Sequence, residues 1–395
     1  MSGALDGIRV LDFSNFIAGP YCAMLLGAMG AEVIRVEPPG GALDRDIGPY
    51  APNGQAMYPW HYSCNKLGVT LDLKNAKAKG LLHKLLARTD VVLEAFSPGV
   101  KKKLGLDLRS LHAVNPAISL LSISGYGQYG PYAERGGLDT VAQGMAGLMA
   151  ITGPEGGEPM RAGVAVVDYG AALYGLYGVM LALYQREKTG RGQAIDISLL
   201  DVAVSFMETV FAEMAVLGVE RKAMGNRRPY TAPTNMFQAK DGYVYVSITT
   251  DLFWRRFCKV AGIDHLRDDP RFNSNRVRYK HQKELNQIAA DWVGARTVEE
   301  VLGEMIPAGI AAGPVLTLPQ VMADEHVSAR NMILEMNYEG VGPVPIPGLA
   351  IKMSENPGQI DTPAPAVGQH NDYVYGELLS CTPEELAALA ADGVI

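Results

Sequence analysis

Residues 8–36 have the sequence IRVLDFSNFIAGPYCAMLLGAMGAEVIRV. Two apolar runs, at 8–13 and 32–36, flank a segment that opens with Ala18-Gly19-Pro20 and closes near Gly30. Short apolar runs bounded by glycine and proline indicate buried strands, and the segment between them indicates a helix. A strand–helix–strand unit implies a right-handed crossover between parallel strands. This stretch therefore predicts an α/β fold.

The same alternation continues through the first 200 residues. It predicts further strands and helices, at 69–73, 76–87, 90–94, 118–124, 169–185 and 192–200. We expect a doubly wound, Rossmann-like large domain at 1–224. Composition shifts near residue 225, and a hairpin pattern at 236–248 followed by helical segments predicts a smaller α+β domain at 225–325. Residues 326–395 are expected to form a linker, proline-rich at 343–367, and a C-terminal segment that returns to the large domain. In its tail, Thr382 and Glu385 have the spacing of a helix capping box.

Composition excludes several classes of protein. Of 395 residues, 48% are hydrophobic and 19% charged, which is enough for a sizeable core and argues against disorder. The net charge of −7 argues against nucleic acid as the main partner. The cysteines and histidines lack the spacing of a disulfide framework or a metal site, so no metal is expected. The start lacks the form of a signal peptide, and the apolar run at 169–185 is shorter than a membrane span, so we expect a cytoplasmic protein without a membrane partner.

Asp168 stands alone at the start of that apolar run. It is the only acid between Glu158 and Glu187. The helix after it is predicted to be buried nearly all round and to end at a C-cap glycine, Gly190. An aspartate in this position is typical of a helix N-cap. A helix N-terminus also stabilises an anion, so the same position suits a carboxylate that stays ionised and attacks a substrate. Both interpretations fit the spacing.

Familiar nucleotide and hydrolase motifs are absent from the sequence. The turn after the first strand, SNFIAGP, has no G-x-G-x-x-G, which a dinucleotide pyrophosphate needs for close backbone approach. The chain also has neither a G-x-x-x-x-G-K-[ST] phosphate loop nor a G-x-S-x-G nucleophile elbow. These absences argue against a nicotinamide-dependent oxidoreductase, a P-loop enzyme and an ordinary α/β-hydrolase.

Several motifs in order carry a resemblance to a known family. They are LDGIRVLDFS with the following AGP, GAEVIRVEPPG, NKLGVTLDLK at 65–74, DVVLEAFSPG at 90–99, ISGYGQYGPYA at 123–133, DTVAQGMAGLM at 139–149 and REKTGRGQ at 186–193. On these residues the chain resembles the family III CoA-transferases, the CaiB/BaiF and formyl-CoA transferase-like enzymes. The resemblance covers nearly the whole chain.

The resemblance implies an activity and a nucleophile. It makes Asp168 the residue that attacks an acyl-CoA thioester, forming an acyl–aspartyl anhydride and then an aspartyl-CoA thioester. The substrates would be an acyl-CoA donor and a carboxylic acid acceptor, with coenzyme A as substrate and no tightly bound cofactor. Because the anhydride conserves the activation of the acyl group, neither ATP nor a metal is required. The family also implies an interlocked homodimer, each chain threading through its partner.

Further binding positions follow from the same resemblance. Asn15 and Ala18 fall where the family's active-site loop approaches the thioester. An adenine and phosphate site is implied at Arg35, Leu71, Leu73, Phe96, Lys103 and Leu104. Asp139 falls on a conspicuous acidic position of the family, with a surface or capping acid as the alternative. The run Lys101–Lys103 suits CoA phosphates, with a solvated helix face as the alternative.

Departures from the family pattern bear on the substrate and the reaction. Ile17 stands where formyl-CoA transferase has glutamine, and the four-glycine flap of that enzyme is absent, which weakens an oxalate or formate assignment. Leu138 stands where the related 2-methylacyl-CoA racemases have a histidine base, which favours transfer over racemisation. A racemase or epimerase and a non-catalytic CoA-binding subunit are the alternatives. Arg227 and Arg228 could bind a dicarboxylate or form a solvated turn.

Overall fold

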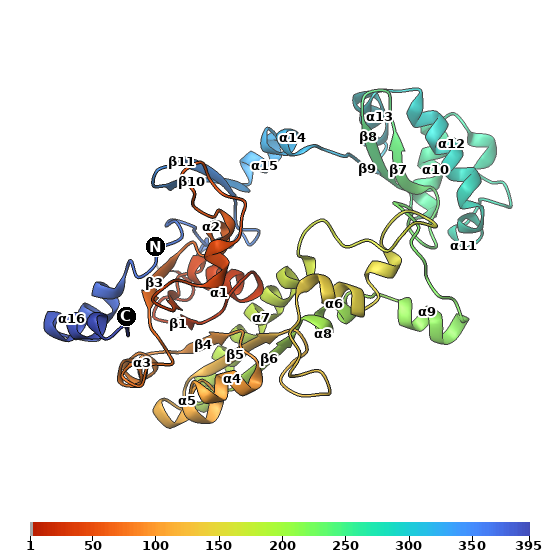
Figure 1. Ribbon diagram of the computed structural model, residues 1–395. Helices are drawn as coiled ribbons and strands as arrows, with labels where there is room; N and C mark the ends of the chain where they lie inside the picture. Colours follow the sequence, from red (N-terminus) through yellow and green to blue (C-terminus); the bar gives the residue numbers. More distant parts are fainter. Residues whose placement is uncertain (1–2) are drawn as a thin grey trace. The chain divides into compact units, whose positions relative to one another are not determined.

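The computed structural model describes residues 3–395, which divide into two compact units (Figure 1). Unit 1 holds the chain up to Leu148, Ala162–Phe211 and Glu325–Ile395. Unit 2 holds Met149–Arg161 and Ala212–Asp324. The first boundary therefore falls earlier than the expected residue 224, and a short segment before Ala162 joins unit 2, which the sequence did not indicate.

Unit 1 is built on a six-stranded sheet in which every pairing is parallel. Its strands are β1 (Arg9–Asp12), β2 (Glu32–Glu37), β3 (Lys66–Thr70), β4 (Val91–Glu94), β5 (Ser119–Ser124) and β6 (Ala194–Ser198). The order β3-β2-β1-β4-β5-β6 is that of a Rossmann-like α/β fold, so the predicted fold class is confirmed. The third strand lies three residues earlier than the predicted 69–73.

Helices cover both faces of this sheet. The helices of the unit are α1 (Ala18–Ala28), α2 (Tyr58–Tyr62), α3 (Ala78–Leu86), α4 (Pro98–Lys103), α5 (Leu108–Val114), α6 (Asp139–Met145), α7 (Val166–Thr189), α8 (Leu199–Ser205), α15 (Glu325–Ala329) and α16 (Pro383–Ala391). One hydrophobic cluster packs α1, α7 and α8 against the sheet. A second packs α3, α5 and residues 374–395 against the other face. Two covered faces explain why β1 to β5 are almost entirely buried, including the charged residues Arg35 and Glu37 of β2.

Helix α7 is longer and less buried than its sequence predicts. It runs for 24 residues and ends at Gly190, whose left-handed φ of 68° confirms the predicted C-cap. One face packs on α1 and on the sheet, while Leu173, Tyr177 and Tyr184 are 52%, 63% and 65% exposed. The expectation of burial nearly all round is therefore wrong for the single chain. By length and composition α7 could cross a membrane, a test that core helices of soluble proteins also pass.

The C-terminal segment packs against the first strands of unit 1. Tyr375 donates its hydroxyl hydrogen to the carbonyl of Thr70 at 2.8 Å, and the carbonyl of Val394 accepts from the Asp72 amide at 2.8 Å. In Figure 1, α16 lies beside α3, in agreement with their shared hydrophobic cluster. The capping box at the start of α16, from Thr382 to Glu385, is the one the sequence predicts.

Part of the proline-rich stretch expected to be a connection forms a hairpin instead. Strand β10 (Ile333–Tyr338) pairs antiparallel with β11 (Gly342–Pro347). The prolines of β11 stand at every second residue, 343, 345 and 347. Because alternate residues of a strand face the same edge, the missing N–H groups all lie on the side away from β10. The prediction of a linker is therefore wrong for residues 343–347, which form β11.

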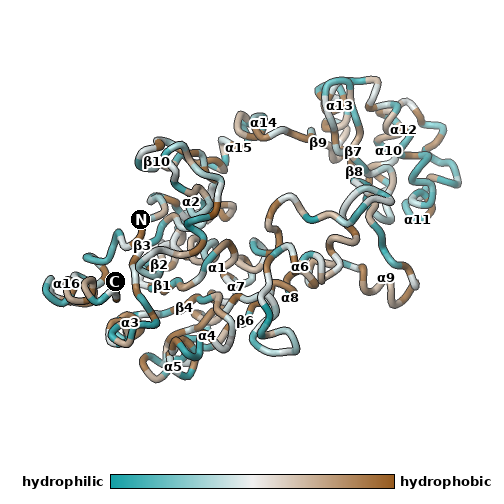
Figure 2. The backbone as a smooth tube through the Cα atoms, viewed as in Figure 1, coloured by the Kyte–Doolittle hydropathy of each residue, from teal (hydrophilic) through white to brown (hydrophobic). Residues whose placement is uncertain are grey.

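Unit 2 has its own sheet and core. An antiparallel sheet of order β7-β8-β9 consists of β7 (Thr234–Gln238), β8 (Tyr243–Ser247) and β9 (Ala311–Pro314). Around it lie α10 (Asp251–Val260), α11 (Asn275–Arg278), α12 (Gln282–Gly294), α13 (Val298–Met305) and α14 (Leu318–Met322). Helix α9 (Val210–Leu217) spans the boundary between the units, and Figure 2 shows it as a largely hydrophobic segment.

Candidate functional site

A cavity of about 210 Å³ opens at the carboxyl edge of the unit 1 sheet. Its walls come from the loops after β1, β4 and β5 and from the starts of α7 and α8. The strand order reverses between β1 and β4, and ligands of open α/β sheets bind outside the carboxyl ends of the strands at such a switch point. The cavity is smaller than a typical ligand pocket, so it suits a small acyl group.

The cavity brings together four of the predicted site residues. Asn15, Ala18, Phe96 and Asp168 all line it. They come from elements that the sequence separates by up to about 150 residues, and the parallel topology places them at one edge. The predicted active-site loop and the predicted nucleophile therefore meet.

Asp168 lies in the first turn of α7, as its third residue, and is not the N-cap. That position belongs to Ala165, so the N-cap interpretation of Asp168 is wrong. Among residues 3–395 its carboxylate has no hydrogen-bond or ion-pair partner. Burial, and then the negative charge of Asp139, raise the pKa of Asp168 to about 7. A carboxylate of this kind is unusually basic and hence a better nucleophile than an ordinary aspartate.

Asp139 supplies the cap that Asp168 does not. Its carboxylate accepts hydrogen bonds from the amides of Val167 at 2.8 Å and Asp168 at 3.1 Å, and from Nε2 of Gln143 at 2.6 Å. It is 6% exposed and does not line the cavity. The capping alternative for Asp139 is thus the one seen, with the cap reaching across from α6 to the first turn of α7.

Buried charged residues hold the loop after β1. We call them the interior ion-pair network, and they are Asp12, Arg35, Glu37, Asp44 and Lys66. Lys66 Nζ and Asp12 Oδ2 are 2.8 Å apart, and both side chains are 0% exposed. Arg35 Nη2 lies 2.6 Å from Asp44 Oδ1 and 3.3 Å from Glu37 Oε1. Buried charges persist when each has an opposite partner in good geometry, as here.

Two carboxylates of the interior ion-pair network reach the loop directly. Asp12 accepts from the amide of Ser14 at 3.0 Å, and Asp44 Oδ2 accepts from the amide of Phe16 at 3.3 Å. Phe16 has a left-handed φ of 66°, which costs a non-glycine residue energy. The network therefore holds a strained residue at the wall of the cavity.

The remaining predicted CoA contacts lie away from the cavity. Arg35 is 1% exposed within the interior ion-pair network, where it also donates to Ser63 Oγ. Leu71, Leu73 and Leu104 belong to the hydrophobic cluster on the α3 face. Lys103 is exposed on α4, whereas Lys101 is engaged with Glu94 and Ser122. These binding roles remain predictions, and an internal partner already occupies Arg35.

Sequence reasoning missed the phenols beside Asp168. Burial raises the pKa of Tyr58, and the charge of Asp168 adds to that rise, so the two groups interact electrostatically. The hydroxyls of Tyr62 and Tyr169 are 3.3 Å apart, and Tyr21 packs edge-on to Tyr169. The only signal was the aromatic segment YPWHY at 58–62, which spacing alone does not connect with Asp168.

Arg135 is a second residue that the sequence did not single out. It lines the cavity, and its guanidinium Cζ lies 3.9 Å from the centre of the Tyr132 ring. It belongs to the loop 125–137, whose two ends touch, because a Cβ built on Gly125 would lie 2.6 Å from Cα of Gly137. Only glycine permits that approach, and it fixes the loop that carries Arg135.

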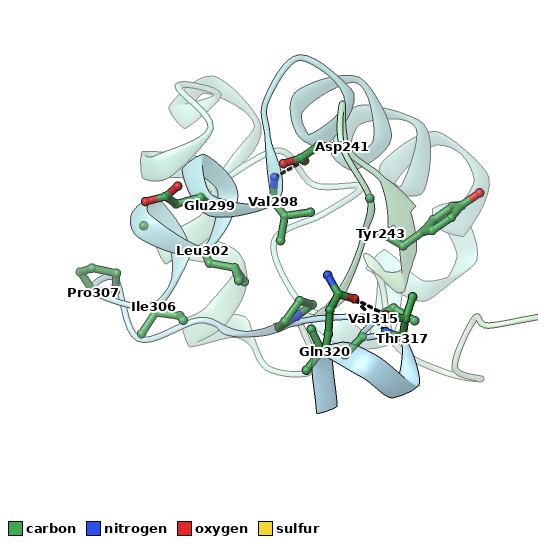
Figure 3. Close-up of a pocket in the computed structure, with 14 residues that line it drawn as sticks. Asp241, Tyr243, Val298, Glu299, Leu302, Ile306, Pro307, Val315, Thr317 and Gln320 are labelled. Carbon is green, nitrogen blue, oxygen red and sulfur yellow. Dashed lines mark hydrogen bonds between the residues drawn. The ribbon is translucent and has the colours of Figure 1, made fainter. Parts of the chain in front are cut away.

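Unit 2 holds a larger cavity of about 830 Å³ with a different character (Figure 3). Figure 3 shows apolar side chains around it, among them Leu302 and Ile306. Asp241 accepts from the Val298 amide at 2.7 Å, so this acid is occupied in holding the chain. No group of three or more His, Cys, Asp or Glu suited to a metal occurs in the part of the chain that the structure describes.

Comparison with known proteins identifies the family. The family model described as CoA-transferase family III matches residues 5–371. The chain belongs to this family. It is 35% identical over 393 residues to succinyl-CoA–D-citramalate CoA-transferase of Chloroflexus aurantiacus, covering 99% of this chain and 98% of the relative. It is 34% identical over 396 residues to succinyl-CoA:glutarate CoA-transferase of Mus musculus, with coverage of 99% and 90%.

Solved structures agree with this assignment. A CaiB/BaiF family protein from Brucella suis superposes with a TM-score of 0.83 at 32% identity, covering 96% of this chain and 100% of that one. The resemblance predicted from the motifs is confirmed, and this family III CoA-transferase is a transferase enzyme.

In unit 2, Arg227 is paired with Glu155 at 2.5 Å, so it is not a free cation.

Proposed function

We propose that this family III CoA-transferase moves CoA from an acyl-CoA donor to a carboxylic acid through covalent intermediates on Asp168. The observation that carries the proposal is the state of that carboxylate. It is the only acid lining the cavity at the carboxyl edge of the sheet, and among residues 3–395 its side chain has no partner. A partnerless carboxylate with a raised pKa is poised to attack and is not tied up in holding the fold.

The first half of the reaction exchanges the donor acid for CoA on the enzyme. The Asp168 carboxylate attacks the thioester carbonyl, the C–S bond breaks, and CoA leaves as thiolate from an acyl–aspartyl anhydride. The thiolate then attacks the aspartyl carbonyl, which releases the donor acid as a carboxylate and leaves an aspartyl-CoA thioester.

The second half repeats these steps in reverse with the acceptor. The acceptor carboxylate attacks the aspartyl thioester, giving a new anhydride and thiolate. The thiolate attacks the carbonyl that came from the acceptor, which frees the new acyl-CoA and the Asp168 carboxylate. One anion enters and one leaves at every step, so no proton donor is required.

The cavity around Asp168 protects such an intermediate in two ways. Its walls are largely apolar, and its small volume leaves little room for water beside an acyl group. Excluding water prevents hydrolysis of the anhydride.

The names of the relatives support a donor with a second carboxylate. The relatives from Chloroflexus aurantiacus and Mus musculus are both named for succinyl-CoA. We propose succinyl-CoA or a similar thioester as the donor. A racemase would need a base opposite Asp168, and no histidine lines the cavity within residues 3–395, where Leu138 contributes to the wall instead.

Intact-protein mass spectrometry tests the covalent route. The protein is incubated with succinyl-CoA and with other acyl-CoAs, then treated with hydroxylamine or borohydride to trap the anhydride or thioester. We expect an acyl- or CoA-sized modification that maps to Asp168, and none in D168N. Solvent deuterium entering the α-position of the acyl-CoA, without any adduct, would overturn the transferase mechanism in favour of a racemase.

We propose further that the active form is an interlocked homodimer. The support is the apolar surface left open on the single chain, on α7 at Tyr177 and Tyr184 and on α9 at Phe211 and Val216. Exposed apolar surface of this extent is typical of an interface. Light scattering should give the mass of two chains, and mixing tagged with untagged dimers should give hybrids only after unfolding and refolding. A monomer, or rapid exchange under native conditions, would contradict the interlocked form.

A further inference from the structure

Two charged residues line the cavity at the sheet edge, the acid Asp168 and the cation Arg135. In the described part of the chain, residues 3–395, the guanidinium of Arg135 has neither a hydrogen bond nor an ion pair. No ion pair within 4.0 Å joins it to Asp168. The proposed reaction uses Asp168 and gives no role to Arg135.

Three contacts hold Arg135 in position without using the N–H donors of its guanidinium. The backbone amide of Arg135 donates to the carbonyl of Tyr132 at 2.8 Å, which closes a turn. The guanidinium Cζ lies over the Tyr132 ring, 3.9 Å from its centre, and that ring meets Tyr126 edge-on at 5.7 Å. The close approach of Gly125 and Gly137 fixes both ends of the loop. A guanidinium stacked through its face keeps its in-plane N–H groups free for an anion.

The chemistry of the cavity defines the anion that fits. The acyl carbon reacts at Asp168, so an anion bound at Arg135 in the same small cavity must be carried by the same acyl group or lie at its edge. The five in-plane donors of a guanidinium match the two oxygens of a carboxylate. Arg135 is an exposed residue at the cavity wall, so an aliphatic acyl group would leave its guanidinium in water, whereas a distal carboxylate gives it a charge-assisted partner.

We propose that Arg135 is the specificity-determining residue of the enzyme and binds the distal carboxylate of a short dicarboxylic acyl group. This inference rests on the proposed transfer through Asp168. It assigns the substrate class as C4–C5 dicarboxylic acids and their CoA thioesters, and it gives the recognition to a loop residue of unit 1.

The test compares substrates that differ only in the distal carboxylate. Succinyl-CoA is matched with butyryl-CoA as donor, and glutarate with valerate as acceptor. In R135M we expect kcat/KM to fall about 10- to 100-fold for the dicarboxylic pair, the worth of one charge-assisted carboxylate contact. The monocarboxylic pair should change less than about threefold. R135K should fall between R135M and the wild type for the dicarboxylic pair.

Arg191→Met is the matched control. Arg191 is exposed and precedes β6, at the opposite end of the sheet from the cavity. The substitution therefore removes the same charge from unit 1 without changing the site. It should leave both substrate pairs unchanged. Circular dichroism and thermal unfolding of R135M should match the wild type, because the loop closure at Gly125 and Gly137 does not involve the side chain.

Three results would overturn the assignment. An equal loss on both substrate pairs would mean that Arg135 binds a part shared by all acyl-CoAs, such as a CoA phosphate. No loss on either pair would mean that it contacts no substrate, and a wild-type enzyme that does not prefer succinyl-CoA to butyryl-CoA would leave nothing for Arg135 to select. Trapping separates this from the parent proposal: R135M must still form the Asp168 adduct with butyryl-CoA, whereas a wild type without any adduct refutes the covalent route itself.

Discussion

Unit 1 treats its charges in two opposite ways within one neighbourhood. In the interior ion-pair network, Lys66 and Asp12 are both fully buried and 2.8 Å apart. In the cavity, Asp168 and Arg135 have no ion-pair partner within residues 3–395. The loop that includes Phe16 contacts both sets, since the Phe16 amide donates to Asp44 of the network and Phe16 also lines the cavity.

The difference shows how a fold can hold a reactive charge. Paired buried charges are neutralised where they lie, and removing one partner is costly because the other remains. An unpaired carboxylate destabilises the folded state but remains available for chemistry, which is the usual conflict between stability and activity. The network supplies rigidity to the loop and the cavity supplies reactivity, so substitutions in the two sets should have opposite effects.

Removing the cavity acid should have the largest effect on activity. We expect D168N to lose at least about 10³-fold in kcat, the scale seen when a covalent nucleophile is removed. A steady-state assay of CoA transfer measures it. D201N is the matched control, because Asp201 is an exposed aspartate in the first turn of α8 and should keep full activity. Substantial turnover by D168N would exclude Asp168 as the nucleophile.

Breaking the network should have the largest effect on stability. K66M leaves Asp12 buried and unpaired, so the free energy of unfolding should fall by about 3 to 5 kcal/mol. The double variant D12L/K66M should regain most of this loss, since it removes both charges. Urea denaturation followed by circular dichroism measures both.

A surface pair provides the contrast for that experiment. Lys77 is 62% exposed in its ion pair with Asp392, so K77M should cost less than about 1 kcal/mol. If K66M and K77M destabilise unit 1 equally, the interior ion-pair network does not have the role assigned to it.

The same D168N that abolishes transfer should stabilise the protein at alkaline pH. The pKa of Asp168 is about 7 in the folded chain against an ordinary value of 3.8. Between these values the unfolded chain has lost a proton that the folded chain keeps, so the free energy of unfolding falls as pH rises. At pH 8 the variant should therefore be more stable by about 1 to 2 kcal/mol, and below pH 4 the difference should vanish. A difference that is constant with pH would contradict this origin.

The smallest expected effect concerns the pH dependence of transfer. Because the nucleophile must be ionised, kcat/KM should rise with pH through an apparent pKa of about 7. D139N removes the neighbouring charge while its amide oxygen can still accept from the Val167 amide. The rise should then move to lower pH by about 1 unit. An unmoved profile would mean that Asp139 acts only as a cap.

The sequence predicted what depends on local pattern. Apolar runs separated by glycine and proline located the strands of the sheet, and the order of motifs identified the family and predicted Asp168 as the nucleophile. Gly190 and the capping box at Thr382 were predicted because caps are written in neighbouring residues.

What escaped prediction depends on residues that meet only in three dimensions. Arg35 was assigned to CoA, yet its partner Asp44 becomes visible only when the chain after β2 folds back. The cap on α7 comes from Asp139, in a different helix. Arg135 gained its place from a ring three residues away and from two glycines that meet across a loop. No periodicity records such contacts.

The bond between Tyr375 and Thr70 joins residues 305 positions apart. On a ribosome that adds 5–20 residues per second, about 15 to 60 s pass between the synthesis of one partner and the other. Throughout that interval residues 374–395 do not yet cover the apolar face of the sheet. The edge strand β3 also lacks its contacts with the C-terminal segment. Nascent sheet edges recruit other strands. Because the chain passes through unit 2 before it returns to unit 1, the nascent enzyme is exposed to aggregation at this sheet until its C-terminal segment has been synthesised.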